Sequence, residues 1–205
     1  MGIGMFGGPI ARFFEEVQGY RRGQDLFLYD IDPKKGYFDD VNKADIIFIA
    51  VPTPRTPSGE ANISAVEAAL RMLKGEKIVV IKSTVPPGTT EKFQKQFSRL
   101  KLLFSPEFLT ERQAWLDFIK PDRQIVGYTK KSMDAAHVVL SLLPKAPFMS
   151  PWGVHTYRPV KITATEAEII KYGGNVYFSR KVNLANVVAQ VADAMGADYE
   201  NIRLG

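Results

Sequence analysis

The stretch DIIFIAV at residues 45–51 decides the fold class. It is almost wholly apolar, as a strand buried on both faces of a parallel sheet should be. The segment KIVVI at 77–81 repeats this character, and a helical pattern over 64–73 separates the two. Two buried strands joined by a helix make a crossover whose strands run parallel. We therefore expect an α/β protein with a Rossmann-like, doubly wound parallel sheet.

The alternation of strands and helices continues on both sides of this unit. Further strands are predicted at residues 3–6, 25–30, 101–104 and 124–127, and further helices at 9–17, 90–97 and 131–143. A last helical pattern runs without proline from Thr163 to about Met195. Thr163 or Thr165, followed by Glu166 and Glu168, would form its N-terminus, and Gly196 its stop. A helix of about 30 residues is about 45 Å long, so we expect it to leave the sheet domain.

Composition narrows the class of protein. The chain has 205 residues, of which 45% are hydrophobic and 24% charged, as in a soluble globular protein. It has no apolar run near the ~18 residues of a membrane span and no signal-peptide pattern, so we expect no membrane partner. With no cysteine and only His137 and His155, we expect no metal site. The absence of cysteine suits a reducing compartment, so we expect the protein in the cytoplasm.

The net charge of +5 suits an anionic ligand such as a nucleotide. A basic solvated surface explains it as well. No cluster of lysine and arginine with interleaved aromatic residues is present, so we expect no nucleic-acid partner.

Every unusual feature of the sequence follows a predicted strand. These features are GGP at 7–9, Asp30, VPTP at 51–54, STVPPGTT at 83–90 and SPEF at 105–108. Parallel sheets of this type bind ligands beyond the carboxyl ends of their strands. The sequence therefore predicts a ligand site at that edge.

Two segments are candidates for a phosphate-binding loop. The literal G-x-G-x-x-G of Gly2, Gly4 and Gly7 is discounted, because no strand can precede residue 2. We prefer 7–11, where Gly7 and Gly8 would let the backbone approach a pyrophosphate at a helix N-terminus. An ordinary tight turn is the alternative.

Asp30 supports the dinucleotide interpretation. It ends a predicted strand 23 residues after Gly7, near the spacing of about 20 expected for a carboxylate that binds ribose hydroxyls. Such a carboxylate repels a 2′-phosphate and favours NAD over NADP, whereas Lys34 and Lys35 oppose this preference.

Hydroxyls and carboxylates follow the next strands. The hydroxyls predicted to lie at the ligand edge are those of Thr53, Ser83 and Thr84. The alternative is that these segments are only turns stiffened by proline, with no role in binding. If Pro106 opens a helical turn, Glu107 and Glu111 share one face, and their proximity would suit acid–base chemistry. The alternative is a solvated helix face with Arg112 as a salt partner.

Lys171 and Asn175 lie one turn apart on the long helix, in the segment KYGGN. Together they could hold a sugar hydroxyl or a developing oxyanion. Gly173 and Gly174 cost helix stability, which suggests that a ligand or another backbone approaches closely. A surface lysine beside a helix crossing is the alternative.

From about residue 45 to its end, the chain resembles the UDP-glucose/GDP-mannose dehydrogenase family. The motifs that carry the resemblance are VPTP at 51–54, KSTVPPGTT at 82–90, SPEFLTE at 105–111, KPDRQIVG at 120–127, EAEIIKYGGNVYFSRKVNLAN at 166–186 and GADYENI at 196–202. The resemblance implies an NAD-binding domain and a central helix that begins a dimerisation domain. This family oxidises a primary alcohol of a nucleotide sugar to a carboxylate with two NAD, passing through an aldehyde and a thiohemiacetal on a cysteine, which points to polysaccharide biosynthesis.

The resemblance also assigns roles to residues. Thr84 would help to place a water, Glu107 would be a general base, Glu111 would support proton transfer, and Lys171 with Asn175 would stabilise the oxyanion. The residues implied to contact NAD are Gly7, Gly8, Asp30, Lys35, Val51, Pro52, Thr53, Ser83 and Thr84. Those implied to contact the sugar nucleotide are Glu107, Phe108, Leu109, Lys171 and Asn175.

The chain departs from the family pattern in several places. The family's cysteine and its nucleotide-holding domain would lie beyond residue 205. The preferred glycine loop is one residue short, with Ala11 for its last glycine, and the connection between Asp30 and Asp45 is shorter than in the family. Arg112 stands where the family often has glycine.

We therefore predict an NAD-binding domain at 1–160, followed at 161–205 by the first helix of a truncated dimerisation domain. The function that we expect is the NAD-binding part of a nucleotide-sugar 6-dehydrogenase of the UDP-glucose type. A non-catalytic NAD-binding sensor or assembly module is the alternative. A β-hydroxyacid dehydrogenase with a similar Lys-x-x-x-Asn helix fits less well, because STVPPGTT and SPEF argue against it.

Overall fold

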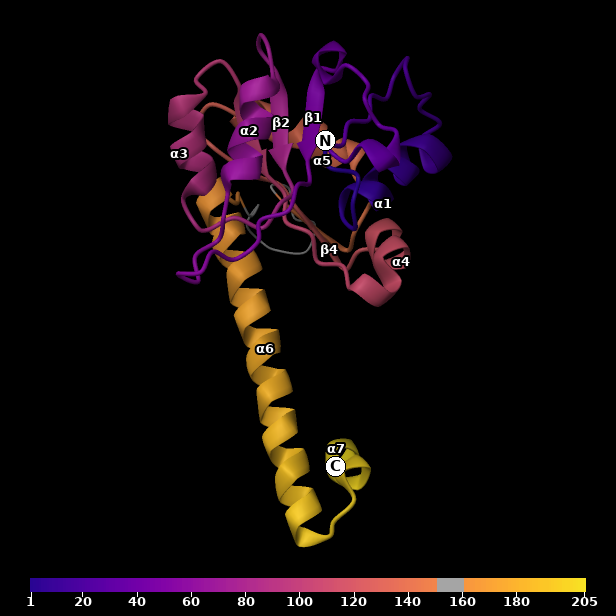
Figure 1. Cartoon of the computed structure of the whole chain (residues 1–205), viewed down its shortest axis with the longest axis vertical. Coiled ribbons are helices and arrows are strands. Elements are labelled where there is room, and N and C mark those ends of the chain that lie inside the picture. The colour runs from indigo at the N-terminus through magenta and orange to yellow at the C-terminus, as the bar shows by residue number, and fades with distance from the viewer. Residues whose placement is uncertain (151–160) are drawn as a thin grey trace. The chain divides into compact units, whose positions relative to one another are not determined.

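The computed structural model describes residues 1–150 and 161–205, which form two compact units (Figure 1). The first unit is Met1–Ile169 and the second is Ile170–Gly205. Each is described by itself. The domain division near residue 160 stays a prediction.

Three parallel strands form the centre of the first unit. The main sheet has the order β1-β2-β3-β5, with strands β1 (Ile46–Ile49), β2 (Ile78–Ile81), β3 (Lys101–Phe104) and β5 (Gly127–Tyr128). The first three pair in parallel, and β5 is antiparallel to β3. The predicted α/β class with a Rossmann-like, mainly parallel sheet and a long C-terminal helix is confirmed.

The strand predicted at 124–127 is divided between two sheets. Its first part, β4 (Arg123–Ile125), pairs with β6 (Phe148–Ser150), whereas Gly127 pairs with Phe104 of the main sheet. Between them, the amide of Val126 still donates to the carbonyl of Ser150. The chain therefore changes partner at Val126, and the main sheet gains an antiparallel edge that the sequence pattern did not predict.

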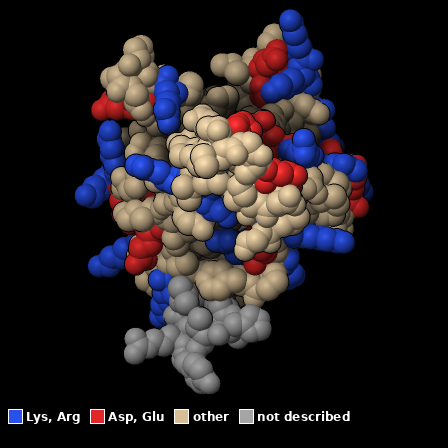
Figure 2. Space-filling model, turned by 90° about the horizontal axis from the view of Figure 1, so that it is seen from below, with Lys and Arg blue, Asp and Glu red and all other residues tan. Residues whose placement is uncertain are grey.

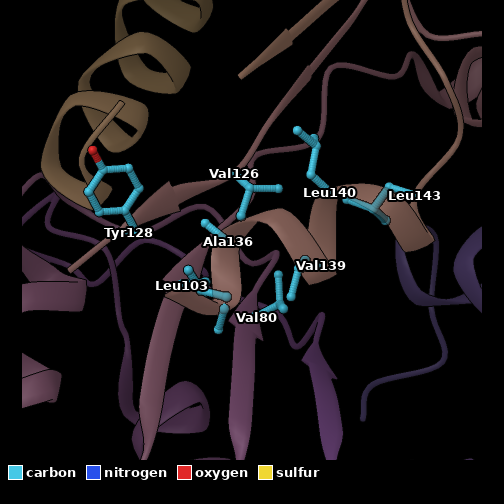
Figure 3. Packing of buried hydrophobic residues seen from close by; sticks show 9 residues of the cluster. Val80, Leu103, Val126, Tyr128, Ala136, Val139, Leu140 and Leu143 are labelled. Atoms are coloured by element: carbon cyan, nitrogen blue, oxygen red, sulfur yellow. The ribbon is translucent and has the colours of Figure 1, made fainter. Parts of the chain in front are cut away.

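Helices cover both faces of the sheet. In Figure 1, α2 (Ser64–Met72) and α3 (Thr89–Gln96) lie in front of the sheet and α5 (Met133–Leu142) behind it. Figure 3 shows side chains of α5 packed on Val80 and Leu103 of the central strands. A smaller apolar cluster joins α1 (Gly7–Arg12), the π-helical turn η1 (Phe13–Val17) and α4 (Ala114–Ile119). The strands are thus buried on both sides, as their apolar sequences require.

The N-terminal region differs from the prediction. Residues 3–6 form no strand, and α1 begins at Gly7, two residues before the predicted start. The strand predicted at 25–30 is also absent, because no described strand forms a ladder with it; the amide of Leu28 donates to the Asp39 carboxylate (2.8 Å). Instead, this segment is held by single bridges, Arg22 to Leu26 and Tyr29 to Phe38.

The long helix α6 (Ala164–Met195) begins and ends near the predicted residues. Thr163 donates through its amide and its hydroxyl to Glu166 (2.7 Å each), which caps the first turn. Gly196 has a φ of +65° and ends the helix. Before the short helix α7 (Tyr199–Leu204), Asp198 provides the cap. Among the helices that the structure describes, none has both the length and the apolar character needed to cross a bilayer.

The first turns of α6 belong to the sheet unit and are anchored there by Glu168. Its buried carboxylate accepts hydrogen bonds from the amides of Gly88 (2.5 Å) and Thr90 (2.8 Å) and from the Thr90 hydroxyl (2.7 Å). Burial raises the pKa of Glu168, and these hydrogen bonds oppose that shift in part. The N-terminus of α3 and the start of α6 are therefore held together by one carboxylate.

Remaining short turns join these elements. They are the 3-10 turns η2 (Pro33–Lys35), η3 (Val41–Lys43) and η4 (Glu111–Gln113).

Candidate functional site

A pocket of about 510 Å³ lies at the carboxyl ends of β1 and β2. Seven of the residues predicted to bind the cofactor line it together: Asp30, Lys35, Val51, Pro52, Thr53, Ser83 and Thr84. The sheet thus gathers segments that are far apart in the sequence, as expected for the ligand edge of a parallel sheet.

The glycine loop of this pocket is Gly2 to Gly7, the motif that the sequence analysis discounted. Gly2 has a φ of +81°, and a Cβ atom there would lie 2.6 Å from the carbonyl oxygen of Ala50. At Gly4, which lines the pocket, a Cβ would meet nothing within 4 Å among the described residues. The backbone is therefore tight at the first glycine and open towards the pocket at the second, as a pyrophosphate loop requires.

Gly7 completes the motif. A Cβ on this residue would overlap the carbonyl oxygen of Gly2, so only glycine permits the contact between loop and helix. Gly8 is the second residue of α1 and does not line the pocket, and no described side chain caps the amides at the start of α1. Residues 7–11 are therefore helical and form no loop, and the predicted contact of Gly7 and Gly8 with NAD stays a prediction.

Gly2 and Gly4 were missed although the literal motif was visible. The motif was discounted because a strand was expected ahead of it, whereas in the structure Gly2 and Gly4 both line the pocket. Met1 donates through its nitrogen to Phe48 (2.7 Å) and accepts from the amide of Ala50 (2.9 Å).

Asp30 is buried at the rim of the pocket, and both of its oxygens accept hydrogen bonds. Oδ2 accepts from the amide of Ile3 (2.6 Å) and from Lys35 Nζ (2.8 Å), and Oδ1 accepts from the amide of Asp32 (2.9 Å). Burial by itself would raise the pKa of Asp30, but the bonds from Lys35 and the two amides lower it overall. The carboxylate stays ionised and keeps lone pairs for further donors such as ribose hydroxyls.

The hydroxyls at the strand ends also stabilise the turns that carry them. The Thr53 hydroxyl donates to the carbonyl of Thr84 (2.7 Å), and the Ser83 hydroxyl donates to the carbonyl of Val51 (2.7 Å). These bonds join the turn after β1 to the turn after β2. Both hydroxyls can still accept a hydrogen bond.

Glu107 is buried beside a lysine that the sequence analysis did not select. Lys82 Nζ lies 3.1 Å from Glu107 Oε2 and 3.2 Å from the Ser105 hydroxyl, and its side chain is 1% exposed. The signal was available in the motif KSTVPPGTT, which begins with this lysine directly after a buried strand. A fully buried lysine is rare without a charged partner, and Glu107 supplies one.

Glu107 and Glu111 do not share a helical face. Residues 105–110 form no helix, and Glu111 is exposed at the start of η4. Thr110 is extended because its amide and hydroxyl both donate to Asp117 of α4 (2.7 Å each). The predicted i,i+4 pair is therefore wrong.

The two residues predicted to line the sugar side follow Glu107. The ring of Phe108 lies 5.0 Å from the Arg123 guanidinium, and Leu109 is half-buried. The catalytic roles of Thr84, Glu107 and Glu111 stay predictions.

Lys171 and Asn175 lie in the second unit, one turn apart on α6. Lys171 is half-buried and Asn175 is exposed. A Cβ at Gly173 or Gly174 would meet nothing within 4 Å among the described residues, so no described backbone explains these glycines. The approach of Lys171 and Asn175 to Thr84 and Glu107 stays a prediction.

Charge is mixed on the face that Figure 2 presents. Lysine and arginine side chains alternate there with aspartate and glutamate. On that face the net charge of +5 is therefore not concentrated in one basic patch.

Comparison with known proteins identifies relatives of the sheet unit. The model of the UDP-glucose/GDP-mannose dehydrogenase family, NAD binding domain, matches residues 2–141. The match begins at Gly2 and so includes the whole glycine motif.

Curated relatives extend the match along the chain. UDP-glucose 6-dehydrogenase TuaD of Bacillus subtilis is 32% identical over 190 residues, which are 85% of this chain and 39% of that protein. A UDP-glucose 6-dehydrogenase of Pseudomonas aeruginosa is 34% identical over 177 residues, or 79% of this chain and 37% of that protein. The chain therefore spans about two fifths of the length of these relatives.

Solved structures of dehydrogenases also resemble this chain. A UDP-glucose dehydrogenase from Pyrobaculum islandicum has a TM-score of 0.70 and 28% identity, covering 98% of this chain and 54% of that one. A GDP-mannose dehydrogenase from Pseudomonas aeruginosa has a TM-score of 0.69 at 21% identity, covering 98% of this chain and 54% of that one, which shows a shared fold.

Proposed function

Because the chain belongs to the UDP-glucose/GDP-mannose dehydrogenase family and residues 2–141 are its NAD-binding domain, we propose that it is part of a nucleotide-sugar 6-dehydrogenase. The whole enzyme would oxidise the primary alcohol of a UDP-glucose-type sugar towards the carboxylate. The observation that carries the proposal is the shared pocket: the glycine loop, Asp30 and the two strand-end turns all line it.

The residues of this pocket fit NAD. Gly4 has no side chain, and no described atom lies within 4 Å of the place where a Cβ would stand, so a pyrophosphate can approach the backbone there. The start of α1 offers amides nearby. Asp30 would hold the ribose hydroxyls and disfavour a 2′-phosphate. When bound, NAD supplies the acceptor for the hydride that leaves the sugar carbon.

We assign the remaining chemistry to residues outside the glycine loop. Thr84 would place a water, and Glu107 would accept a proton from it. The Lys82 ammonium, 3.1 Å from Glu107, would keep that carboxylate in position. Lys171 and Asn175 would bind the reacting sugar oxygen, and Glu111, Phe108 and Leu109 would lie on the substrate side. Since the 205 residues contain no cysteine, the family's second oxidation would need a thiol from elsewhere.

Calorimetric titration with NAD tests the cofactor site. Asp30→Asn should weaken NAD binding by about 10-fold or more, because a charge-assisted hydrogen bond to ribose is lost. The variant should also bind NAD and NADP with more similar affinities than the unchanged chain does. Asp134→Asn, on α5 outside the pocket, is the matched control and should leave the affinity unchanged. Equal NAD affinities for the chain and for Asp30→Asn would refute the assignment.

A second experiment separates an enzyme from a binding module. The chain alone, given NAD and UDP-glucose, should form no uronate; detecting that product would contradict the proposal. In a chimera that adds the remaining portion of a family dehydrogenase, the enzyme hypothesis predicts turnover that Lys171→Ala reduces by orders of magnitude. A sensor or assembly module would show no turnover in either form and would keep its NAD affinity.

We further propose that the protein acts in the cytoplasm, in polysaccharide biosynthesis, as a homodimer. Dimerisation is supported by large apolar side chains of α6 that are exposed within the second unit. They are Val176, Tyr177, Phe178, Val182, Leu184, Val187, Val191 and Met195. Sedimentation equilibrium would test the oligomeric state.

A further inference from the structure

A second cavity, of about 700 Å³, lies beside the free edge of β1, and nothing in the proposed function uses it. Its long walls are residues 24–28 on one side and 43–48 on the other. Phe48 and Ile47 both line it, and successive side chains of a strand point to opposite faces of the sheet. The cavity, which we call the edge slot, is therefore open to both faces of the sheet beside β1.

Met1 and Gly2 already form the end of a strand in this slot. Met1 donates to Phe48 O (2.7 Å) and accepts from Ala50 N (2.9 Å), the parallel pattern that sets Met1 opposite Ile49. Gly2 turns the other way and donates to Tyr29 O (2.9 Å). Alternation between two neighbours is the hydrogen-bonding pattern of a central strand.

The edge slot continues this register towards Asp45. Positions ahead of Met1 would lie opposite Phe48, Ile47, Ile46 and Asp45 in turn, all of which line the slot. Four residues of a parallel strand extend about 13 Å. Alternate residues of β1 turn their amides and carbonyls away from β2, towards this space. A small apolar molecule would fill volume there but would pair with none of these groups.

The slot is also apolar where an added strand would need it to be. Ile10, Phe14 and Leu142 line it from α1, η1 and α5, and Leu28 lines the opposite wall. Parallel strands buried in this way are runs of apolar residues.

We propose that the edge slot accepts one further parallel strand, an extended apolar segment of about four residues joined directly to Met1. The strand would lie between residues 25–29 and β1 and would become a central strand of the sheet. A peptide bond at the Met1 nitrogen would also replace the ammonium that is buried there, whose pKa burial lowers to about 6 although Asp30 opposes the shift.

The test compares three chains: the 205 residues, the same chain with Val-Ile-Val-Ile between an initiator methionine and Met1, and an equal extension of Ser-Gly-Ser-Gly. The apolar extension should raise Tm by roughly 5–10 °C over the Ser-Gly control, since it buries several apolar side chains. Its amides, and those of Gly2 and Phe48, should exchange with solvent at least about 10-fold more slowly. Equal Tm values and an extension that exchanges freely would overturn the proposal.

A substitution in the slot locates the effect. Ile46→Asp should abolish the gain in Tm from the apolar extension, because a carboxylate would lie on the same face of the sheet beside an apolar side chain of the added strand. Ile31→Asp, at a position that is 88% exposed and outside the edge slot, should preserve it. The comparison is the difference between extended and unextended chains within each variant, so destabilisation by the substitution itself cancels. If the extension still raised Tm in the Ile46→Asp variant, it would bind outside the edge slot and the proposal would be wrong.

Discussion

The carbonyl oxygen of Gly2 occupies the space that a Cβ atom on Gly7 would need. The first residue of α1 and the first glycine of the loop are thus in direct backbone contact, and Gly7 is buried by it. This contact fixes the angle at which the helix leaves the loop, and Gly2 and Gly4 of the loop line the pocket that we propose for NAD.

Gly7→Ala should therefore lower both stability and NAD affinity, because the loop must move to admit a methyl group. We expect a loss of about 1–3 kcal/mol in the free energy of unfolding, measured by urea denaturation. Gly8→Ala is the matched control: a Cβ there meets nothing within 4 Å, and alanine is the better helix former. Equal stability of the two variants would contradict this account of the contact.

Gly4→Ala should separate binding from folding. A Cβ at this position touches no described residue but stands beside the pocket, so the unfolding free energy should change by less than about 1 kcal/mol. NAD affinity should fall by about 10-fold or more, since the methyl group blocks the approach of the pyrophosphate. Calorimetry on the variant measures the affinity, and an unchanged value would remove Gly4 from the site.

The buried pair of Lys82 and Glu107 should be costly to break. Lys82→Met leaves a buried carboxylate without this partner, and we expect a loss of about 3–5 kcal/mol in urea denaturation. The double variant Lys82→Met with Glu107→Leu should lose less than the sum of the two single variants, because no unpaired charge remains. Additive losses would mean that the two side chains do not interact.

Gly127 should be required for docking the start of α6. A Cβ there would lie 2.7 Å from the Ala167 Cβ and 2.7 Å from the Thr163 carbonyl, so Gly127→Ala should displace the helix. We expect a loss of about 1–3 kcal/mol on thermal or urea unfolding. Gly173→Ala, with open space around its Cβ, is the control and should be neutral or stabilising by up to about 1 kcal/mol. An unchanged free energy of unfolding for Gly127→Ala would contradict a close contact between Gly127 and the start of α6.

Stability should rise between pH 6 and pH 8. Burial lowers the pKa of the Met1 ammonium from its ordinary value of 8.0 to about 6, so in this range the unfolded chain binds more protons than the folded one. The free energy of unfolding then increases with pH, by about 2–3 kcal/mol in total. Urea denaturation at pH 6, 7 and 8 measures it, on protein whose mass confirms that Met1 is present.

The control for this pH dependence is the chain with an acetylated N-terminus. Acetylation removes the titrating amine, so the rise from pH 6 to pH 8 should disappear while other groups titrate as before. A rise of the same size in the acetylated chain would assign the effect to another group.

The sequence by itself determined the elements whose signals are local. DIIFIAV, KIVVI and KLLF are apolar runs of strand length, and they became β1, β2 and β3. The bounds of α6 were also readable, because Thr163 with Glu166 and Gly196 are strong start and stop signals. The place of the pocket followed as well, since parallel strands bring their carboxyl ends to one edge.

Only the tertiary structure decided features that depend on a distant partner. The segment 25–30 has a strand-like pattern but no described strand forms a ladder with it, and Lys82 accompanies Glu107 into the interior, although neither outcome is visible in local periodicity. The motif of Gly2, Gly4 and Gly7 was visible in the sequence but was discounted because a strand was expected ahead of it; the contacts of Gly2 with Ala50 and Gly7 exist only in the folded chain. Apolar periodicity reports the burial of a segment, whereas the partner of a particular polar or backbone atom is set by packing between segments.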